Sequence, residues 1–408
     1  MNEFFKVTPI EHVLNYTSDF APVEAEIISL PDALERILAE DIVSDINIPD
    51  FARSTMDGYA VSAKSTFGAS ESNPAYFMVK GAVFMGETPD FSIGPEQAAR
   101  IPTGGMLPKG ADSVVMIEHT EAVDDSTIEV YRAVAPGQHI VDIGEDILQG
   151  NTILPKGVKI RPQELGLLAA LGRTRLSVYR QPVVGIISTG DELIPIDQIP
   201  AAGKIRDINT YTLAGLVREA GGIPLIFGIM RDNFDQLHET CSLAASQSDM
   251  MLISGGSSVG TRDFTIDAIS SLPESEILVH GISISPGKPT ILARVGNKMF
   301  WGLPGHVVSA MVVFSVVVRP FFDRISGITL PRGMKRITAR LTRNLPSAQG
   351  RTDFIRVRFI EKSGEIWAEP VIGKSGLINT MVKADGLVEI PVNTEGFDQD
   401  TPVNVIPL

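Results

Sequence analysis

The 408-residue sequence has little of several features that define large classes of protein. Its one cysteine, Cys241, excludes an internal disulfide and any metal site built from several cysteines. The longest mostly apolar run covers residues 307–318, which is well short of the ~20 residues that a membrane-spanning helix needs. Residues 1–6 show no basic region followed by an apolar stretch, so we expect no signal peptide and a soluble, cytoplasmic protein.

Positive charge is also scarce. The chain has 35 Lys and Arg against 49 Asp and Glu, which gives a formal net charge of −14. Nucleic-acid binding depends on Lys and Arg that displace counterions from phosphates, so this balance argues against a nucleic-acid partner. The six histidines include no close pair such as H-E-x-x-H, which argues against a zinc enzyme.

What is present is an ordinary globular composition, with 44% hydrophobic and 21% charged residues, and length for about three domains. Residues 1–46 are predicted to be helical, with Ser29 as the N-cap of a helix that includes residues 33–39. Residues 147–180 contain a second predicted helix at 163–171. Packing of that helix against the first segment would make one split domain.

Two other stretches are predicted to be mainly β. Residues 47–146 carry short β-rich runs between recurring Pro, Gly, Ser and Thr, which is typical of a small β module. Residues 327–408 include a clean apolar–polar alternation at 353–359, a turn at Ser363–Gly364 and a return strand at 366–368. This pattern predicts a small barrel or sandwich.

Residues 181–326 alternate between strands and helices. The strands are apolar and β-branched, as expected for a sheet that is covered on both faces. The pattern therefore predicts a doubly wound, mainly parallel α/β domain, with strands at 182–188, 223–229 and 249–254 and helices at 210–220, 234–246 and 264–271. The β-branched run at 307–318 is long enough for a buried helix, and we interpret it as one.

The predicted strands end in polar, glycine-rich loops. Parallel strands bring their carboxyl ends to one edge of the sheet, where ligands bind. The loops that reach this edge are 188–192, 231–232, 254–260, 285–289 and 302–306. Glycine lets backbone N–H groups approach a ligand closely, so such loops suit phosphates and other oxyanions.

Carboxylates accompany these loops. Glu192, Asp232 and Asp263 stand next to them in the sequence, where they would repel a phosphate unless a cation lay between. Magnesium prefers oxygen ligands and is the cation that we expect. The phosphate loop differs from a Walker A motif, because Gly287-Lys288 is followed by Pro289 and the four-residue spacer is missing.

A hydrolase is the rival interpretation. Residues 256–260 fit G-x-S-x-G with Ser258 as the nucleophile. Acid and base partners would follow in the order of a hydrolase triad: Asp263 or Asp267, then His280 or His306. A nucleophile elbow needs a helix that starts at the serine, however, and residues 260–262 delay the helix here.

Eight short motifs together resemble those of one known family. They are Pro-Asp-Phe-Ala-Arg-Ser-Thr-Met-Asp-Gly-Tyr-Ala at 49–60, Ile-Pro-Thr-Gly-Gly at 101–105, Gly-Glu-Asp at 144–146, Ser-Thr-Gly-Asp-Glu-Leu at 188–193, Asp-Ile-Asn at 207–209, Ser-Gly-Gly at 254–256 with Gly260 and Asp263, Pro-Gly-Lys-Pro at 286–289, and Gly-Leu-Pro-Gly at 302–305. In this order and spacing, over essentially the whole chain, they resemble the molybdopterin molybdenumtransferases, the MoeA and gephyrin E-domain family.

The resemblance implies four domains. Residues 1–46 and 147–180 would form the split, mainly helical domain, and residues 47–146 the inserted β module. Residues 181–326 would form the α/β molybdopterin-binding domain and residues 327–408 a C-terminal β-barrel. Members form homodimers whose active cleft lies between the α/β domain of one subunit and the inserted module of the other.

The resemblance also implies a reaction in molybdenum cofactor biosynthesis. Molybdate, or tungstate, is inserted into adenylylated molybdopterin, with magnesium-dependent release of AMP. The implied partners are the molybdopterin-adenylating protein and molybdoenzyme-maturation factors.

Site residues follow from the matched motifs. Magnesium or an ordered water would be held by four carboxylates, Asp57, Glu192, Asp232 and Asp263. Phosphate or oxyanion would accept hydrogen bonds from three hydroxyls, Thr103, Ser257 and Ser375, and Lys288 would supply positive charge. The remaining expected substrate-binding residues are Ser188, Gly190, Gly255, Gly256 and Pro304.

Three positions depart from the family pattern. Val141 and Ser285 stand where many members carry a basic residue, and His306-Val307 replaces the usual Asn-Pro. A charge-assisted hydrogen bond is worth roughly 1.5–3 kcal/mol, so the loss of two cations would weaken oxyanion capture. This leaves three alternatives. Arg262, Lys374 or His306 replaces the missing positive charge, or the oxyanion preference has shifted toward tungstate. In the third, the chain is a catalytically weak paralogue that acts as a pterin-binding or scaffold protein.

Overall fold

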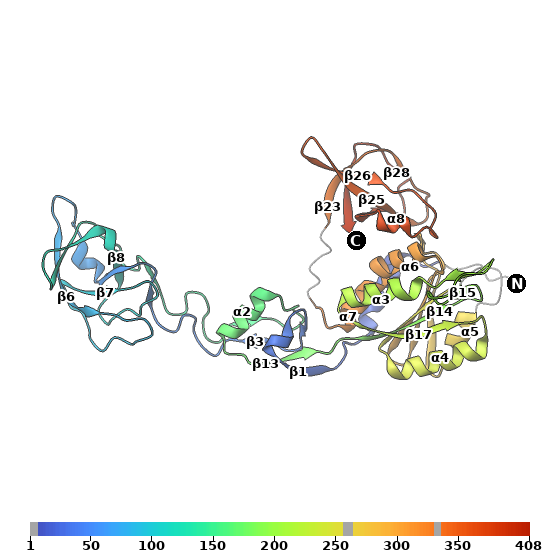
Figure 1. Ribbon diagram of the computed structural model, residues 1–408, viewed down its shortest axis with the longest axis horizontal. Coiled ribbons are helices and arrows are strands. Elements are labelled where there is room, and N and C mark those ends of the chain that lie inside the picture. The colour runs from blue at the N-terminus through green and yellow to red at the C-terminus, as the bar shows by residue number, and fades with distance from the viewer. Residues whose placement is uncertain (1–6, 256–263, 330–335) are drawn as a thin grey trace. The chain divides into compact units, whose positions relative to one another are not determined.

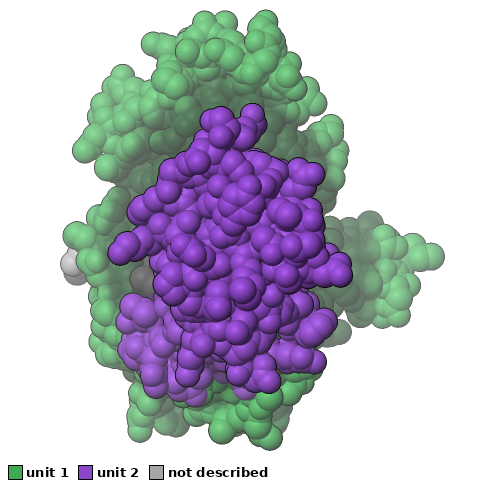
Figure 2. Space-filling view, turned by 90° about the vertical axis from the view of Figure 1, so that its left-hand side faces the viewer, with its two compact units in different colours: residues 1–40, 156–169, 173–408 green, residues 41–155, 170–172 purple. Residues whose placement is uncertain are grey.

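The computed structural model describes residues 7–255, 264–329 and 336–408 (Figure 1). The chain divides into two compact units, which are coloured separately in Figure 2. Unit 1 comprises Met1–Glu40, Lys156–Ala169 and Arg173–Leu408, and unit 2 comprises Asp41–Pro155 and Ala170–Gly172. No helix of the described residues is long and apolar enough to cross a membrane.

Unit 2 is built on a six-stranded sheet with the order β8-β5-β7-β6-β10-β9. Its strands are β5 (Gly58–Val61), β6 (Ala75–Ala82), β7 (Gln97–Ile101), β8 (Ser113–Met116), β9 (Thr120–Ala122) and β10 (Thr127–Val130), and two short ladders pair β4 (Arg53–Ser54) with β11 (Ile140–Val141) and β3 (Ile42–Val43) with β12 (Thr152–Leu154). Phe77, Val115 and Ile128 come from different strands and are buried in one hydrophobic cluster, which explains why these short runs form a stable sheet.

Unit 1 contains the predicted α/β domain. Its six-stranded sheet has the order β17-β14-β18-β22-β21-β19, with β21 the single antiparallel strand. The strands are β14 (Val183–Thr189), β17 (Ile223–Met230), β18 (Met250–Ser254), β19 (Ser275–His280), β21 (Ile291–Val295) and β22 (Lys298–Leu303), and a short parallel ladder joins β15 (Leu193–Ile194) to β16 (Ile205–Arg206). The mainly parallel sheet is therefore confirmed.

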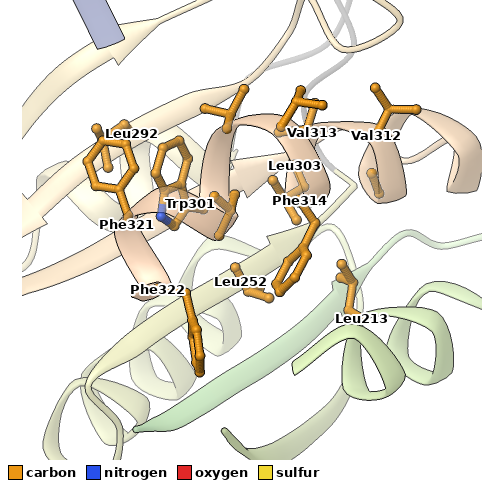
Figure 3. Packing of buried hydrophobic residues seen from close by; sticks show 14 of the residues in the cluster. Leu213, Leu252, Leu292, Trp301, Leu303, Val312, Val313, Phe314, Phe321 and Phe322 are labelled. Carbon is orange, nitrogen blue, oxygen red and sulfur yellow. The ribbon is translucent and has the colours of Figure 1, made fainter. Parts of the chain in front are cut away.

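Helices cover both faces of this sheet (Figure 1). The first face carries α3 (Asn209–Ala220), α6 (Val307–Val313) and α7 (Arg319–Ile325), and the second carries α4 (Phe234–Gln247) and α5 (Phe264–Ser270). The helical interpretation of 307–318 is confirmed, because α6 continues through a π-helical turn, Phe314–Val318, into α7. Figure 3 shows Trp301 on the sheet packed edge-on against Phe321 of α7, with ring centroids 5.0 Å apart.

The N-terminal segment and residues 156–180 hold a small sheet as well as helices. The sheet has the order β1-β13-β2, with β1 (Ala25–Ser29), β2 (Ile37–Leu38) and β13 (Arg175–Tyr179), and the helices here are α1 (Ile10–Asn15) and the predicted α2 (Pro162–Ala170). Residues 1–46 are not mainly helical as predicted, since the only α-helix described there is α1 and the segment also forms β1, β2 and β3. The helix predicted through 33–39 is likewise wrong. A 3₁₀ turn ends at Ala33, Glu35 has φ +65°, and Leu38 pairs with Val178 of β13. Pairing and burial of β2 outweigh the helix propensity of this stretch, which amounts to fractions of a kcal/mol per residue.

The C-terminal part forms a closed five-stranded barrel with the order β25-β26-β23-β29-β27, in which β27 pairs back to β25. Its elements are β23 (Ile337–Leu341), β25 (Thr352–Lys362), β26 (Glu365–Pro370), α8 (Asn379–Val382), β27 (Gly386–Ile390) and β29 (Pro402–Pro407), with β24 (Leu345–Pro346) paired to β28 (Gly396–Phe397) at the side. The predicted turn at Ser363–Gly364 is confirmed, since both residues have positive φ. One strand of the α/β domain, β20 (Ile284–Ser285), adds to β25.

Candidate active site

A large pocket lies at the carboxyl ends of β14 and β17. We call it the Gly190 pocket; its volume is about 820 Å³, and it is lined by Gly190, Asp207, Tyr211, Ile226 and Arg231 among others. Its lining mixes apolar side chains with the charged residues Asp191, Lys204, Asp207 and Arg231. This mixture suits an organic ring with an anionic group.

Three carboxylates surround the Gly190 loop. Burial raises the pKa of Asp232, and the negative charges of Asp191 and Glu192 raise it further. The carboxylate of Glu192 covers Gly190, where a Cβ atom would lie 2.6 Å from Glu192 Oε2. The structure therefore brings Glu192 and Asp232 together as predicted, and it adds Asp191 to the group.

The carboxylates fit magnesium chemically, because they are oxygen donors whose mutual repulsion a divalent cation would relieve. The described residues contain no ready-made group of three His, Cys, Asp or Glu for a metal. Magnesium commonly uses one or two carboxylates together with substrate phosphates, so a preformed cage is not required.

Gly255 follows β18 in the middle of this edge. Its φ is +101°, and a Cβ atom there would lie 2.2 Å from the carbonyl oxygen of Thr189. Its N–H donates to the carbonyl of Leu303 at 3.2 Å, and Gly305 lies directly against it. Only glycine fits this position, which fixes the backbone between the ends of β14, β18 and β22.

Gly255→Ala should destabilise the α/β domain by more than about 3 kcal/mol, because it adds both backbone strain and steric overlap. The matched control is Gly215→Ala on the surface of α3, where a Cβ atom would meet nothing within 4 Å. That control should stabilise by roughly 0.5–1 kcal/mol. Urea denaturation followed by tryptophan fluorescence measures both, and equal midpoints for the two variants would contradict this account.

Ser188 lies below the surface of the edge. Its hydroxyl is fully buried and bonds to the carboxylate of Asp207 at 3.0 Å and to the hydroxyls of Thr210 at 3.0 Å and Ser254 at 3.1 Å. Asp207 in turn accepts from the N–H and the hydroxyl of Thr210 at the start of α3. Ser188 is thus placed to hold the strand ends together rather than to meet a ligand directly.

A second hollow, the Lys288 cleft, lies where the loop before β21 and the loop after β22 meet the barrel. It has a volume of about 460 Å³. Its polar lining consists of Lys288, Arg351, His306, Gln349 and the serines Ser283, Ser285, Ser309 and Ser375. None of its described lining residues is a carboxylate, although the chain as a whole carries a net charge of −14.

The sequence reasoning missed Arg351. It lies in the barrel, and the pairing of Ser285 in β20 with Asp353 in β25 brings it into the cleft. Its Nε lies 2.9 Å from Asp353, whose side chain is only 4% exposed. No local motif announces this pairing, because the two segments are far apart in the sequence.

Three predicted residues meet in the Lys288 cleft. Lys288 is exposed at its wall, Pro304 is buried beside it, and Ser375 comes from the barrel. The hydroxyl of Ser375 lies 2.9 Å from Nδ1 of His306. Ser285, one of the positions that lacks the usual family cation, also lies here.

Asp57 and Thr103 form a contact of their own in unit 2. Oδ1 of Asp57 accepts from the backbone N–H of Thr103 at 2.6 Å and from its hydroxyl at 2.8 Å. The N–H and then the hydroxyl of Thr103 lower the pKa of Asp57, so this exposed carboxylate is ionised at neutral pH. Val141, the other position without the usual cation, pairs with Arg53 in the same unit.

Thr103→Val should raise the pKa of Asp57 only part of the way to its ordinary value, because the backbone N–H remains as a donor. Thr103→Ser is the control and should leave the pKa low. At pH values above the ordinary carboxyl pKa, the contacts that lower the pKa of Asp57 stabilise the loop. This stabilisation is lost as pH falls through the lowered pKa. Carbon-13 NMR titration of the carboxylates tests this; identical pKa values in Thr103→Val and wild type would contradict it.

Gly256, Ser257 and Asp263 lie outside the described residues, as does Ser258 of the hydrolase interpretation. The described part of that segment begins with α5 at Phe264. His306, one of the two bases proposed for a hydrolase, is hydrogen-bonded to Ser375.

Comparison with known proteins covers nearly the whole chain. Three family models match: the MoeA N-terminal region (domain I and II) over residues 8–172, the probable molybdopterin binding domain over residues 185–324, and the MoeA C-terminal region (domain IV) over residues 338–408.

Relatives match at similar length. A putative molybdopterin biosynthesis protein of Methanocaldococcus jannaschii is 38% identical, covering 93% of this chain and 91% of its own. The molybdopterin molybdenumtransferase of Bacillus subtilis is 34% identical, covering 94% and 90%. The crystal structure of a molybdopterin biosynthesis MoeA protein from Pyrococcus horikoshii OT3 superposes with a TM-score of 0.86 at 32% identity, covering 99% of this chain and 100% of that one.

Proposed function

The chain belongs to the MoeA family of molybdopterin molybdenumtransferases, enzymes of molybdenum cofactor biosynthesis, and on that basis we propose that it inserts molybdate or tungstate into adenylylated molybdopterin and releases AMP. The observation that carries the proposal is the Lys288 cleft. A hollow lined by two cations, a histidine and four serines, with no described carboxylate, suits a tetrahedral oxyanion in an otherwise acidic protein.

In this proposal the oxyanion accepts hydrogen bonds from Lys288, Arg351 and Ser375. Arg351 is oriented by its ion pair with the buried Asp353, and Lys288 is carried on a backbone whose carbonyl accepts from the N–H of Ile282 at 2.9 Å. Donors fixed before the oxyanion arrives need little rearrangement as charge develops during transfer. The cleft is larger than one oxyanion, which leaves room for the sulfur-bearing end of the pterin.

The rest of the substrate would lie along the sheet edge. The order of the strands places the Gly190 pocket at the ends of β17 and β14, Gly255 at the end of β18, and the Lys288 cleft beyond β22. The apolar residues that line the Gly190 pocket suit an organic ring, and the pyrophosphate would then lie between this pocket and the Lys288 cleft.

Glu192 and Asp232 would hold magnesium with the substrate phosphates, and Asp263 stays part of this proposal. When bound, the metal would offset the repulsion between these carboxylates and the pyrophosphate, and it would polarise the phosphoanhydride bond whose cleavage releases AMP. The carboxylates would hold the metal in place and exclude a second anion from this end of the edge.

We also propose that the active form is a homodimer in which Asp57 and Thr103 of the inserted module join the magnesium end of the other subunit's active site, beside Glu192 and Asp232. The support is that Asp57 is ionised and held next to the hydroxyl of Thr103, while both side chains are exposed rather than packed in the interior of unit 2. The molybdopterin-adenylating protein and molybdoenzyme-maturation factors are the proposed partners.

The test is AMP release from adenylylated molybdopterin with magnesium, during titration with molybdate and tungstate in parallel. Release that saturates with one oxyanion supports the transferase and identifies its metal.

A second candidate function, a catalytically weak pterin-binding or scaffold paralogue, is favoured by Ser285, which lies in the cleft where many members carry a cation. Tight pterin binding without AMP release would support it, and Ser285→Lys with Val141→Arg would then restore release.

A further inference from the structure

His306 is fixed at the wall of the Lys288 cleft from both sides. On its N-terminal side, the amide of Asn209 donates to the carbonyl of Gly305 at 2.8 Å. On its C-terminal side, the N–H of Val308 donates to the carbonyl of Ser375 at 3.1 Å. The imidazole is itself exposed, and its Nδ1 lies 2.9 Å from the hydroxyl of Ser375. Neither the loop nor the ring is therefore free to turn away from the cleft without breaking a contact.

We propose that His306 is a direct ligand of the oxyanion, and that its protonated ring adds a positive charge to the cleft. This inference rests on the proposed function, since it assigns a further residue to the same cleft. The described residues provide no hydrogen-bond partner for Nε2, which leaves that nitrogen for a ligand. A dianionic oxyanion has only acceptor oxygens, so each added N–H donor in the cleft strengthens its binding.

Protonation of His306 changes two donors at once. In the neutral ring with Nδ1 unprotonated, the hydroxyl of Ser375 donates to Nδ1 and only Nε2–H is available to the oxyanion. In the imidazolium, Nδ1–H donates to the oxygen of Ser375, and the hydroxyl hydrogen of Ser375 is free to turn to the oxyanion. One proton therefore adds a charge and converts Ser375 into a second donor.

The surrounding charges make the effect attributable to His306. Lys288, from the loop before β21, and Arg351, from the segment before β25, line the same cleft, while Lys374 adjoins Ser375 in sequence. Asp353 is buried behind Arg351 and is not among the residues that line the cleft. Lysine and arginine keep their charge at neutral pH, whereas imidazole ordinarily changes charge between pH 5 and 8. The cleft's affinity for an oxyanion should then fall as pH rises through that range.

The experiment is calorimetric titration of the full-length protein with dilute molybdate between pH 6.0 and 8.5. Wild type should lose about tenfold or more in affinity across this range, the equivalent of one charge-assisted hydrogen bond. It should also take up a proton on binding, measured by repeating the titration in buffers of different ionisation enthalpy. His306→Asn and His306→Gln should bind with little change across the same range and without proton uptake.

His238→Asn is the matched control, because His238 of α4 makes the same kind of contact with a serine, Ser271, at 2.7 Å but lies outside the cleft. It should keep the wild-type pH dependence. An equal pH dependence in wild type and His306→Asn would overturn this inference and leave the proposed function intact. No molybdate or tungstate binding by wild type at any pH would instead overturn the proposed function.

Discussion

Lys288→Met is expected to weaken molybdate binding about 10- to 100-fold and to remove oxyanion-dependent AMP release. The expected loss equals one charge-assisted hydrogen bond, roughly 1.5–3 kcal/mol. The fold should be unaffected, because the Lys288 side chain is exposed while its loop is fixed by backbone contacts. Calorimetry with molybdate and an AMP assay measure the two effects.

Lys383→Met is the control for Lys288→Met. Lys383 is another exposed lysine of unit 1, on the barrel, but it is not part of the Lys288 cleft. Removing it changes the net charge by the same amount, so an effect of long-range charge would appear in both variants. Equal loss of affinity in the two variants would contradict a specific role for Lys288.

The double substitution Glu192→Gln with Asp232→Asn is expected to lower magnesium-dependent turnover more than 100-fold while slightly stabilising the substrate-free protein. Loss of turnover follows from removal of two proposed magnesium ligands, each replaced by a neutral amide of the same shape. The gain in stability follows from the raised pKa of Asp232, which shows that its charge is unfavourable where it lies. The rise in Tm should be small, of the order of 1 °C.

The raised pKa of Asp232 also predicts how the stability difference between wild type and the double variant changes with pH. A carboxyl with a raised pKa contributes stability below its ordinary pKa, and that contribution is lost as pH rises through the raised value. Wild type should therefore lose stability relative to the double variant between mildly acidic and neutral pH, and magnesium should reduce the difference. A variant that is less stable than wild type at neutral pH, or one that retains full turnover, would contradict the role given to these carboxylates.

The α/β domain could be predicted from the sequence because its signals are local. Apolar β-branched strands such as 182–188, helices ended by glycine, and the length of the run at 307–318 each determine their element with little help from distant residues. The polar loops at the strand ends then placed Gly190, Glu192 and Asp232 at one edge by topology alone.

The rest depended on contacts between distant segments. The residues at 33–39 favour a helix locally, yet Leu38 is buried in a ladder with β13. Arg351 gave no signal, because it enters the Lys288 cleft only through the pairing of β20 with β25. Likewise, the contact between His306 and Ser375 joins a loop of the sheet to the barrel, and spacing along the chain does not reveal it.

The central claim is that the Lys288 cleft holds the oxyanion, and the most direct measurement is a crystal structure of the protein soaked with tungstate, with data collected at the tungsten absorption edge. The anomalous difference map is expected to show its strongest peak within hydrogen-bond distance of Lys288, Arg351 and Ser375, and Lys288→Met should weaken that peak. A strongest peak at the Gly190 pocket, or a cleft without tungsten at saturating tungstate, would contradict the claim.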